Sequence, residues 1–184
     1  PISTHGSKES PHVGVWSAIS DLHHDNDGKI PNNSFLRHSE RVIARYRLIP
    51  EGGRMPPPSE LPPEIRRKNF GNTYKRLHRF RPSLTLVPGN NAFPIHPLAH
   101  RSLSPREAAR LQCFPDTFVF FGSRAEQCKL VGNVVPVGLA EQIGLSIQRH
   151  LAAGVAPEAA SLREPIAPVR QLSRAPPAPA TRHP

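Results

Sequence analysis

The sequence predicts an α+β chain, with short extended segments in its first half and helices in its second half. Residues 71–95 contain short apolar runs that Pro82, Pro88 and Pro94 interrupt, so any extended segment there must be short. Residues 101–154 instead carry two helix-start signals and apolar residues at helical spacing. The 23 prolines among 184 residues exclude a chain built mainly of long helices and central strands.

The first segment, residues 1–33, is expected to be irregular. The apolar run at 12–19 fits a short strand or the beginning of a helix, and its periodicity does not discriminate between them. Residues 21–33 are rich in Asp, Asn and Gly, which is typical of a loop. The adjacent His23 and His24 have no cysteine or acidic partner at ligand spacing, so no metal site is predicted.

A helix is expected at about 35–48. Asn33 or Ser34 can cap its first turn, and Pro50 stops it. Its apolar positions are Leu36, Val42, Ile43, Tyr46 and Leu48. They leave one arginine-rich face, made of Arg37, Arg41 and Arg45.

Residues 34–98 form a basic region. Residues 50–64 are a proline-rich connection, and residues 84–87 are the strongest candidate for an extended segment. Between positions 37 and 81, 12 Lys and Arg stand against 4 acids, so 8 of the 10 net positive charges lie in 45 residues. Such a cluster favours a polyanionic partner, most simply nucleic acid, although a solvated basic loop explains the charge equally well.

Capping boxes predict two helices in the region 99–154. In Ser104–Glu107 the hydroxyl and the carboxylate can each satisfy a backbone N–H, and the intervening proline suits the first helical position. This helix is expected to end near Gln112. Ser123–Glu126 repeats the spacing, and Gly132 is expected to end the second helix.

A third helix is expected from Pro136 to Gly154. Its apolar residues at helical spacing predict one buried stripe, made of Leu139, Ala140, Ile143, Ile147 and Leu151. Residues 155–184 are rich in Ala, Pro and Arg without periodicity, so a disordered tail is predicted.

Composition excludes several other classes of protein. The two cysteines, Cys113 and Cys128, fit neither a disulfide framework nor a zinc site. No apolar run approaches the roughly 18 residues of a membrane helix, and no signal peptide is visible. A cytoplasmic protein without a membrane partner is therefore expected.

The most distinctive motifs are RSLSPREAARLQ at 101–112, followed by FPD at 114–116, and QCKLVGNVVP at 127–136. They resemble the ninth and tenth conserved blocks of the DNA cytosine-5 methyltransferases, in the family's order and near its spacing. Weaker similarity upstream extends the resemblance over roughly 1–150, with a target-recognition region at 34–98.

The resemblance implies the C-terminal portion of a Rossmann-like methyltransferase. The family attacks cytosine with the cysteine of a Pro-Cys dipeptide, which this sequence lacks. The cofactor loop and the blocks that precede the ninth are also missing, so position 1 is expected to fall just after the eighth block. Cys113 and Cys128 are expected to be small packed residues, and no catalytic residue is assigned.

The resemblance also implies contacts with DNA. Thr85 is similar to a threonine near the flipped nucleotide and would bond a phosphate; its alternative is a β-branched residue of a short strand. Three arginines near it are candidates for contacts with phosphates or guanine edges, or else face solvent. They are Arg76, Arg79 and Arg81.

Arg101, Arg106 and Glu107 resemble positions that hold the recognition region against the catalytic domain. Asn133 and Val134 belong to the block that lines the pocket for S-adenosyl-L-methionine in the family. A helix cap ahead of the next helix is the alternative role of Asn133.

The predicted function is transfer of methyl from S-adenosyl-L-methionine to C5 of cytosine in double-stranded DNA, in a restriction–modification or orphan setting. The chain is expected to be inactive alone and to need the N-terminal catalytic portion, on the same or a separate chain. The alternatives are a DNA-recognition subunit of a split enzyme and a non-catalytic DNA-binding remnant.

Overall fold

Helices and irregular loops make up the described part of the chain, which covers residues 6–24, 29–66, 74–87 and 93–153 of a computed structural model. The α-helices are α1 (Val15–Ile19), α2 (Glu40–Arg47), α3 (Pro105–Leu111), α4 (Arg124–Asn133) and α5 (Val137–Ala152). The short 3-10 helices are η1 (Asp21–His24), η2 (Pro58–Glu60) and η3 (Pro63–Ile65). The chain divides into a unit ending at Ile147 and a second one beginning at Gln148. All packing described below lies in the first unit.

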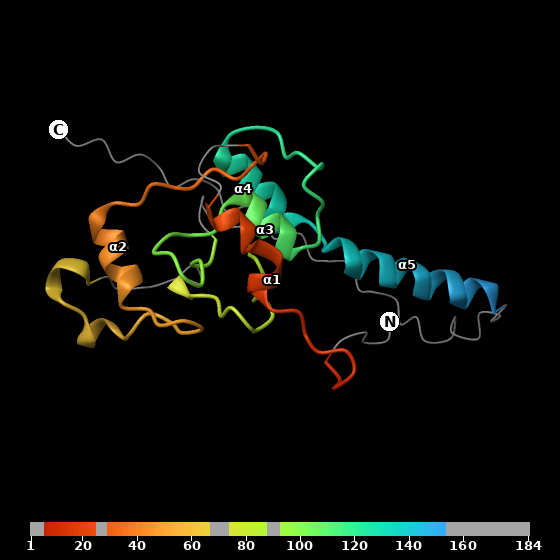
Figure 1. Ribbon diagram of the computed structural model, residues 1–184, viewed down its shortest axis with the longest axis horizontal. Coiled ribbons are helices and arrows are strands. Elements are labelled where there is room, and N and C mark those ends of the chain that lie inside the picture. The colour runs from red at the N-terminus through yellow and green to blue at the C-terminus, as the bar shows by residue number, and fades with distance from the viewer. Residues whose placement is uncertain (1–5, 25–28, 67–73, 88–92, 154–184) are drawn as a thin grey trace, which may run out of the picture. The chain divides into compact units, whose positions relative to one another are not determined.

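The main core lies where α1, α3 and α4 meet, with α1 against α3 and α3 against α4 (Figure 1). Its buried residues are Val15, Ile19, Leu77, Leu86, Phe93, Leu103, Ala108, Ala109, Phe120, Cys128 and Val131. The apolar run at 12–19 thus resolves into helix α1. Gly14, which precedes α1, packs so closely that a Cβ there would lie 2.7 Å from the carbonyl oxygen of Arg79.

Both predicted capping boxes are confirmed. The backbone N–H of Glu107 donates to Ser104 Oγ at 3.0 Å, and the Ser104 N–H donates to the Glu107 carboxylate at 2.7 Å. Ser123 and Glu126 make the same pair of bonds at the start of α4. Each box satisfies two donors that the first turn of a helix leaves free.

The predicted end of α4 is wrong. Gly132 lies inside the helix, which continues to Asn133. Val134 then turns to extended dihedral angles, φ −78° and ψ 155°. Pro136 cannot lie in the interior of a helix, because its ring would clash with the carbonyl four residues earlier, so the proline accounts for the break between α4 and α5 better than the glycine does.

The predicted start of α2 is also wrong. The helix begins at Glu40 after Ser39, whose hydroxyl makes no capping bond. Asn33 does not cap it because its side chain is bound elsewhere: its amide donates to the Leu22 carbonyl and its oxygen accepts from Ser104 Oγ at 2.7 Å. Phe35 also lies outside the helix, and its ring packs against Arg101, whose guanidinium carbon is 3.7 Å from the ring centre.

The arginine-rich face of α2 is not wholly exposed. Arg45 is buried and donates to the carbonyl of Ile65 at 2.7 Å. Arg41 donates to the carbonyl of Glu64. These bonds fasten α2 to η3, so two of the three predicted surface arginines hold the structure together.

Backbone pairing among the described residues is limited to isolated bridges. They join Arg54 to Lys75, Arg76 to Ile95 and Ile95 to Ser102. Residues 84–87 pair with no neighbour, so the expected extended segment forms no strand. A second apolar cluster, of Tyr46, Ile49, Tyr74 and Ile95, packs around these bridges. The helices of the expected α+β class are therefore present, but strands are not seen in the described ranges.

The apolar stripe of α5 is exposed, which contradicts its predicted burial. Leu139, Ile143 and Ile147 are 49%, 39% and 56% exposed, and Ala140 and Leu151 are exposed as well. The helical spacing correctly predicts α5, but among the described residues no element covers its apolar face. Gly154, the expected end of the helix, and the tail at 155–184 lie outside the described residues.

The stretch Arg124–Ala152 is long and apolar enough to cross a membrane by length and composition alone. This finding corrects the expectation that no apolar run approaches that length. Pro136 nevertheless divides the stretch into α4 and α5. An uncovered apolar helix face is also what a helix presents when its packing partner is another protein segment.

Candidate functional site

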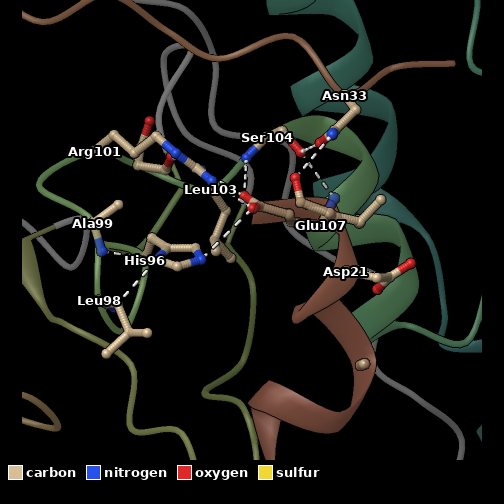
Figure 2. Close-up of polar contacts among 12 residues, drawn as sticks. Asp21, Asn33, His96, Leu98, Ala99, Arg101, Leu103, Ser104 and Glu107 are labelled. Carbon is tan, nitrogen blue, oxygen red and sulfur yellow. Dashed lines mark hydrogen bonds and ion pairs between the residues drawn. The ribbon is translucent and has the colours of Figure 1, made fainter. Parts of the chain in front are cut away.

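The carboxylate of Glu107, at the beginning of α3, contacts the segment before the helix at three residues, His96, Arg101 and Ser104 (Figure 2). It is fully buried and accepts two parallel hydrogen bonds of 2.7 Å from Arg101. It also accepts from the Ser104 N–H, as part of the capping box. A buried charge is stable only when it is paired and hydrogen-bonded, and Glu107 meets both conditions.

His96 lies beside this pair, with its Nε2 3.8 Å from the Glu107 carboxylate (Figure 2). Its Nδ1 accepts from the backbone N–H groups of Leu98 at 3.1 Å and Ala99 at 2.9 Å. Two donors at Nδ1 place the proton of the neutral ring on Nε2. Burial, with the nearby charge of Arg101, lowers the pKa of His96 to about 2. The ring is therefore neutral at physiological pH.

Arg106 is fully buried and fastens two loops to α3. Its guanidinium donates to the carbonyls of Pro31, Pro115 and Phe118 at 2.9, 3.0 and 2.6 Å. It also donates to the side-chain oxygen of Asn32 at 3.2 Å. Arg101, Arg106 and Glu107 thus all make contacts within this chain, and their predicted role between the recognition region and the catalytic domain stays a prediction.

Arg76 was expected to contact DNA, but the structure places it in the interior. Its side chain is inside the protein, with 4% of the residue exposed. The guanidinium donates to the carbonyls of Ile49, Tyr46, His96 and Ala99 at 2.7–2.8 Å. With its donors used in this way, Arg76 cannot reach DNA without leaving the fold, and the structure corrects the expectation.

Arg79 and Arg81 instead lie on a turn at the surface. Arg79 is half-exposed and pairs with Glu51 at 3.0 Å. Arg81 is exposed, and its guanidinium has no partner among the described residues. Thr85 is also exposed, while the adjacent Leu86 belongs to the core. These three side chains remain available for the contacts predicted for them.

Asn133 lines an open pocket of about 470 Å³. One wall consists of residues on one face of α4, and the other is the loop at 121–122. The lining residues are Phe121, Gly122, Glu126, Lys129, Leu130 and Asn133. Val134 is half-buried at the end of α4 and does not line the pocket. The structure therefore separates the two predicted cofactor residues.

The two cysteines differ in their surroundings. Cys128 is buried in the core, and burial raises the pKa of its thiol, which opposes nucleophilic use. Cys113 is exposed and has a positive φ of 63°, so the expectation that it packs in the interior is wrong. The raised pKa and burial of the Cys128 thiol are the opposite of what a catalytic cysteine needs.

Two residues that hold these loops together, Asn32 and Glu51, were not predicted from the sequence. Asn32 has a positive φ of 67°, and its side chain bonds both the N–H and the carbonyl of Phe120, at 2.9 and 2.7 Å. Glu51 accepts from the backbone N–H of Arg79 at 2.7 Å as well as from its guanidinium. The Asn-rich loop was a signal for the first, because asparagine tolerates positive φ. No local pattern indicated the second. Among the described residues, no cluster of His, Cys, Asp and Glu is placed to hold a metal.

Comparison with known proteins shows which family this chain belongs to. A profile of the C-5 cytosine-specific DNA methylases matches residues 2–149, most of the chain. The chain belongs to this family. The family's members use S-adenosyl-L-methionine as methyl donor. The resemblance drawn from the two motifs is thereby confirmed.

The match to this chain covers a different share of the length of each related cytosine-5 methylase. It is 34% identical over 128 residues to Type II methyltransferase M.NgoFVII of Neisseria gonorrhoeae, covering 68% of this chain and 33% of the relative. For M.PspPI of a Psychrobacter species the identity is 36% over 156 residues, covering 78% and 38%. For M.AquIB of a Picosynechococcus species it is 32% over 133 residues, covering 66% and 90%. The chain thus spans a little over a third of the first two relatives at most, but nearly all of the third.

Proposed function

We propose that this chain is the DNA-recognising, C-terminal portion of a DNA cytosine-5 methyltransferase. In this role it works with an N-terminal catalytic portion that supplies the nucleophile. The observation that carries the proposal is the exposed apolar stripe of α5, in a chain that spans about a third of the family members M.NgoFVII and M.PspPI. Leaving such a stripe in water is costly, and the catalytic portion is the natural surface to cover it.

The chemistry divides between the two portions. The reaction needs a thiolate that adds to the cytosine ring, after which the ring carbon takes the methyl group of S-adenosyl-L-methionine. Cys128 is buried with a raised pKa, and neither cysteine stands in a Pro-Cys dipeptide. We therefore assign the nucleophile to the catalytic portion and DNA reading to this chain.

Arg79, Arg81 and Thr85 form the proposed DNA contact. They lie within seven positions of one another, on a surface segment that Leu77 and Leu86 anchor to the core. Arginine and threonine are common partners of phosphate oxygens. Arg81 is the strongest of the three because its guanidinium has no competing partner among the described residues.

Asn133 is the proposed cofactor contact. The pocket it lines combines its amide with the aromatic ring of Phe121 and the side chain of Leu130. Glu126 and Lys129 add charged groups to the same lining. Apolar surface with a few polar groups suits the adenosyl part of S-adenosyl-L-methionine. The pocket is open on one side, so these residues fit one wall of a cofactor site, and the catalytic portion would complete it. Val134 is proposed to support Asn133 from the end of α4.

A split enzyme is the second candidate, and one observation favours it. M.AquIB is covered to 90% of its length by its match to this chain, so a Type II methyltransferase chain of similar extent exists. In that case the catalytic portion is a separate polypeptide and the two assemble through α5. A cytoplasmic location accords with both candidates.

Reconstitution tests the proposal. The chain should transfer no labelled methyl to DNA by itself and should become active when an N-terminal catalytic portion of the family is added. Ile143→Glu should abolish this gain, because it places a charge in the apolar stripe of α5. Gln148→Glu, which adds the same charge at an exposed polar position of that helix, should not. Methyl transfer by the chain alone would refute the assignment of the nucleophile.

The cofactor contact needs a separate measurement in the reconstituted enzyme. Asn133→Ala should raise the Michaelis constant for S-adenosyl-L-methionine about five-fold, the effect of losing one hydrogen bond of about 1 kcal/mol. DNA affinity should change little. A lower melting temperature with unchanged cofactor kinetics would instead make Asn133 a purely structural residue.

A further inference from the structure

Phe80 is one of two highly exposed phenylalanines among the described residues of the first unit, together with Phe121. It is 73% exposed, although the leucines that precede and follow it in the core, Leu77 and Leu86, are almost fully buried. It occupies the turn between His78 and Arg81, which the Arg81 N–H closes by donating to the His78 carbonyl at 3.3 Å. A scattered exposed apolar residue needs no explanation by itself, so the setting of this one decides its meaning.

The turn that carries Phe80 is held from several sides. The N–H groups of Val15 and Trp16, in the first turn of α1, donate to the carbonyls of Arg81 and Arg79, both at 3.0 Å. The Phe80 N–H donates to His78 Nδ1 at 3.1 Å. Gly14 packs against the same backbone, where a Cβ would lie 3.0 Å from the Phe80 Cα. The ring is therefore presented to solvent by a fixed backbone, and not by a loose loop.

Cationic residues precede and follow Phe80 in the sequence. The Arg79 guanidinium carbon lies 5.4 Å from the centre of the ring, and Arg81, the next residue after Phe80, is exposed. An exposed aromatic ring with an arginine before and after it in the chain suits nucleic acid, in which flat apolar bases lie between charged phosphates. Proteins that bend duplex DNA use phenylalanine in this way, as a wedge between neighbouring base pairs.

We infer that Phe80 is a wedge residue that inserts between adjacent bases of duplex DNA while Arg79 and Arg81 contact the flanking phosphates. This inference rests on the proposed DNA-recognising function and adds a base-contacting residue to it. The rigid turn is suited to the task because separating stacked bases is costly, and a flexible support would yield before the bases do. The contribution of the ring comes from contact with the faces of the bases, which all four bases offer.

A duplex with one abasic site tests the wedge, because such a site offers a gap without any loss of stacking. The full chain should bind this duplex about tenfold more tightly than the intact one. Phe80→Ala should lose the preference and bind both duplexes alike. Leu48→Ala removes an apolar side chain that is 41% exposed at the end of α2, and this control should keep the preference.

Two outcomes separate failure of the wedge from failure of the proposed function. Salt-dependent binding of the intact duplex, with equal abasic preference in the wild type and Phe80→Ala, would overturn the wedge alone. Absence of salt-dependent binding to either duplex would overturn both. An unchanged thermal midpoint for Phe80→Ala, expected for so exposed a ring, shows that its effect on binding does not come from unfolding.

Discussion

Acid should destabilise this protein through His96. The folded protein holds the ring neutral, with a pKa lowered from 6.5 to about 2 by burial and by the charge of Arg101. In the unfolded chain the same group binds a proton below its ordinary pKa. The unfolded state therefore takes up more protons as the pH falls through 6.5, and the free energy of unfolding must decrease.

The size of the effect follows from the two pKa values. At pH 5.5 about nine in ten unfolded chains carry a proton on this histidine, while the folded form carries almost none. Relative to pH 7.5, the free energy of unfolding should fall by about 1.4 kcal/mol from His96 alone. The geometry agrees with the direction, because a proton on Nδ1 would displace the bonds from the N–H groups of Leu98 and Ala99.

Urea unfolding at the two pH values, followed by tryptophan fluorescence, measures this loss. Trp16 is a suitable reporter because it is the sole tryptophan and its ring lies 5.9 Å from the His96 ring, edge to face. His96→Asn is the matched control: its side-chain oxygen can accept from the same two N–H groups, but it does not titrate. The variant should lose about 1.4 kcal/mol less than the wild type between pH 7.5 and 5.5.

The comparison isolates His96 from histidines that lie apart from its ring. Burial also lowers the pKa of His38 and His100, neither of which contacts the His96 ring, so the wild type and the variant share their contribution. If both proteins lost stability in parallel, His96 would titrate alike in the folded and unfolded states. The buried, neutral ring beside Glu107 would then be refuted.

Three further predictions concern named side chains. Arg76→Lys should lower the free energy of unfolding by roughly 3 kcal/mol in urea, because an ammonium group cannot replace a guanidinium that donates to four carbonyls; a near-neutral effect would mean that the buried network contributes little. Arg81→Glu should leave the melting temperature unchanged but reduce the slope of log affinity against log salt for duplex DNA by about 1, and an unaltered slope would remove Arg81 from the DNA contact. Ser104→Ala should cost more than Ser123→Ala, which should cost about 1 kcal/mol, since Ser104 is buried and also donates to Asn33; equal melting temperatures for the two variants would contradict this ranking.

Local signals in the sequence predicted the helices of the second half well. A capping box acts over four residues, so Ser104 and Ser123 mark the beginnings of α3 and α4 without any knowledge of the fold. The start of α2 was missed for the opposite reason. Asn33 looks like a helix cap locally, but its side chain is used by Ser104, 71 positions away.

The candidate site was harder to predict for the same reason. Arg76 lies in a basic cluster that favours DNA, yet its acceptors are carbonyls 20 to 30 positions away in the sequence. Arg79 and Arg81 have the same local setting but lie on the surface. The spacing of apolar residues correctly predicts helix α5. Whether its apolar face is buried depends on the segment that packs on it, and no described segment covers that face.

The buried and half-buried arginines of this fold donate mainly to main-chain carbonyls. Arg45, Arg76, Arg106 and Arg124 together hold segments near 31, 46–49, 65, 96–103 and 115–118. Every amino acid has the same main-chain carbonyl. These hydrogen bonds therefore depend on the backbone path of a loop and not on the identity of its side chains. Exposed residues of the loops between these hydrogen bonds can therefore be replaced without removing the bonds. Under the DNA-recognising function proposed above, such a scaffold would allow the residues that face DNA to change while the packing beneath them stays the same.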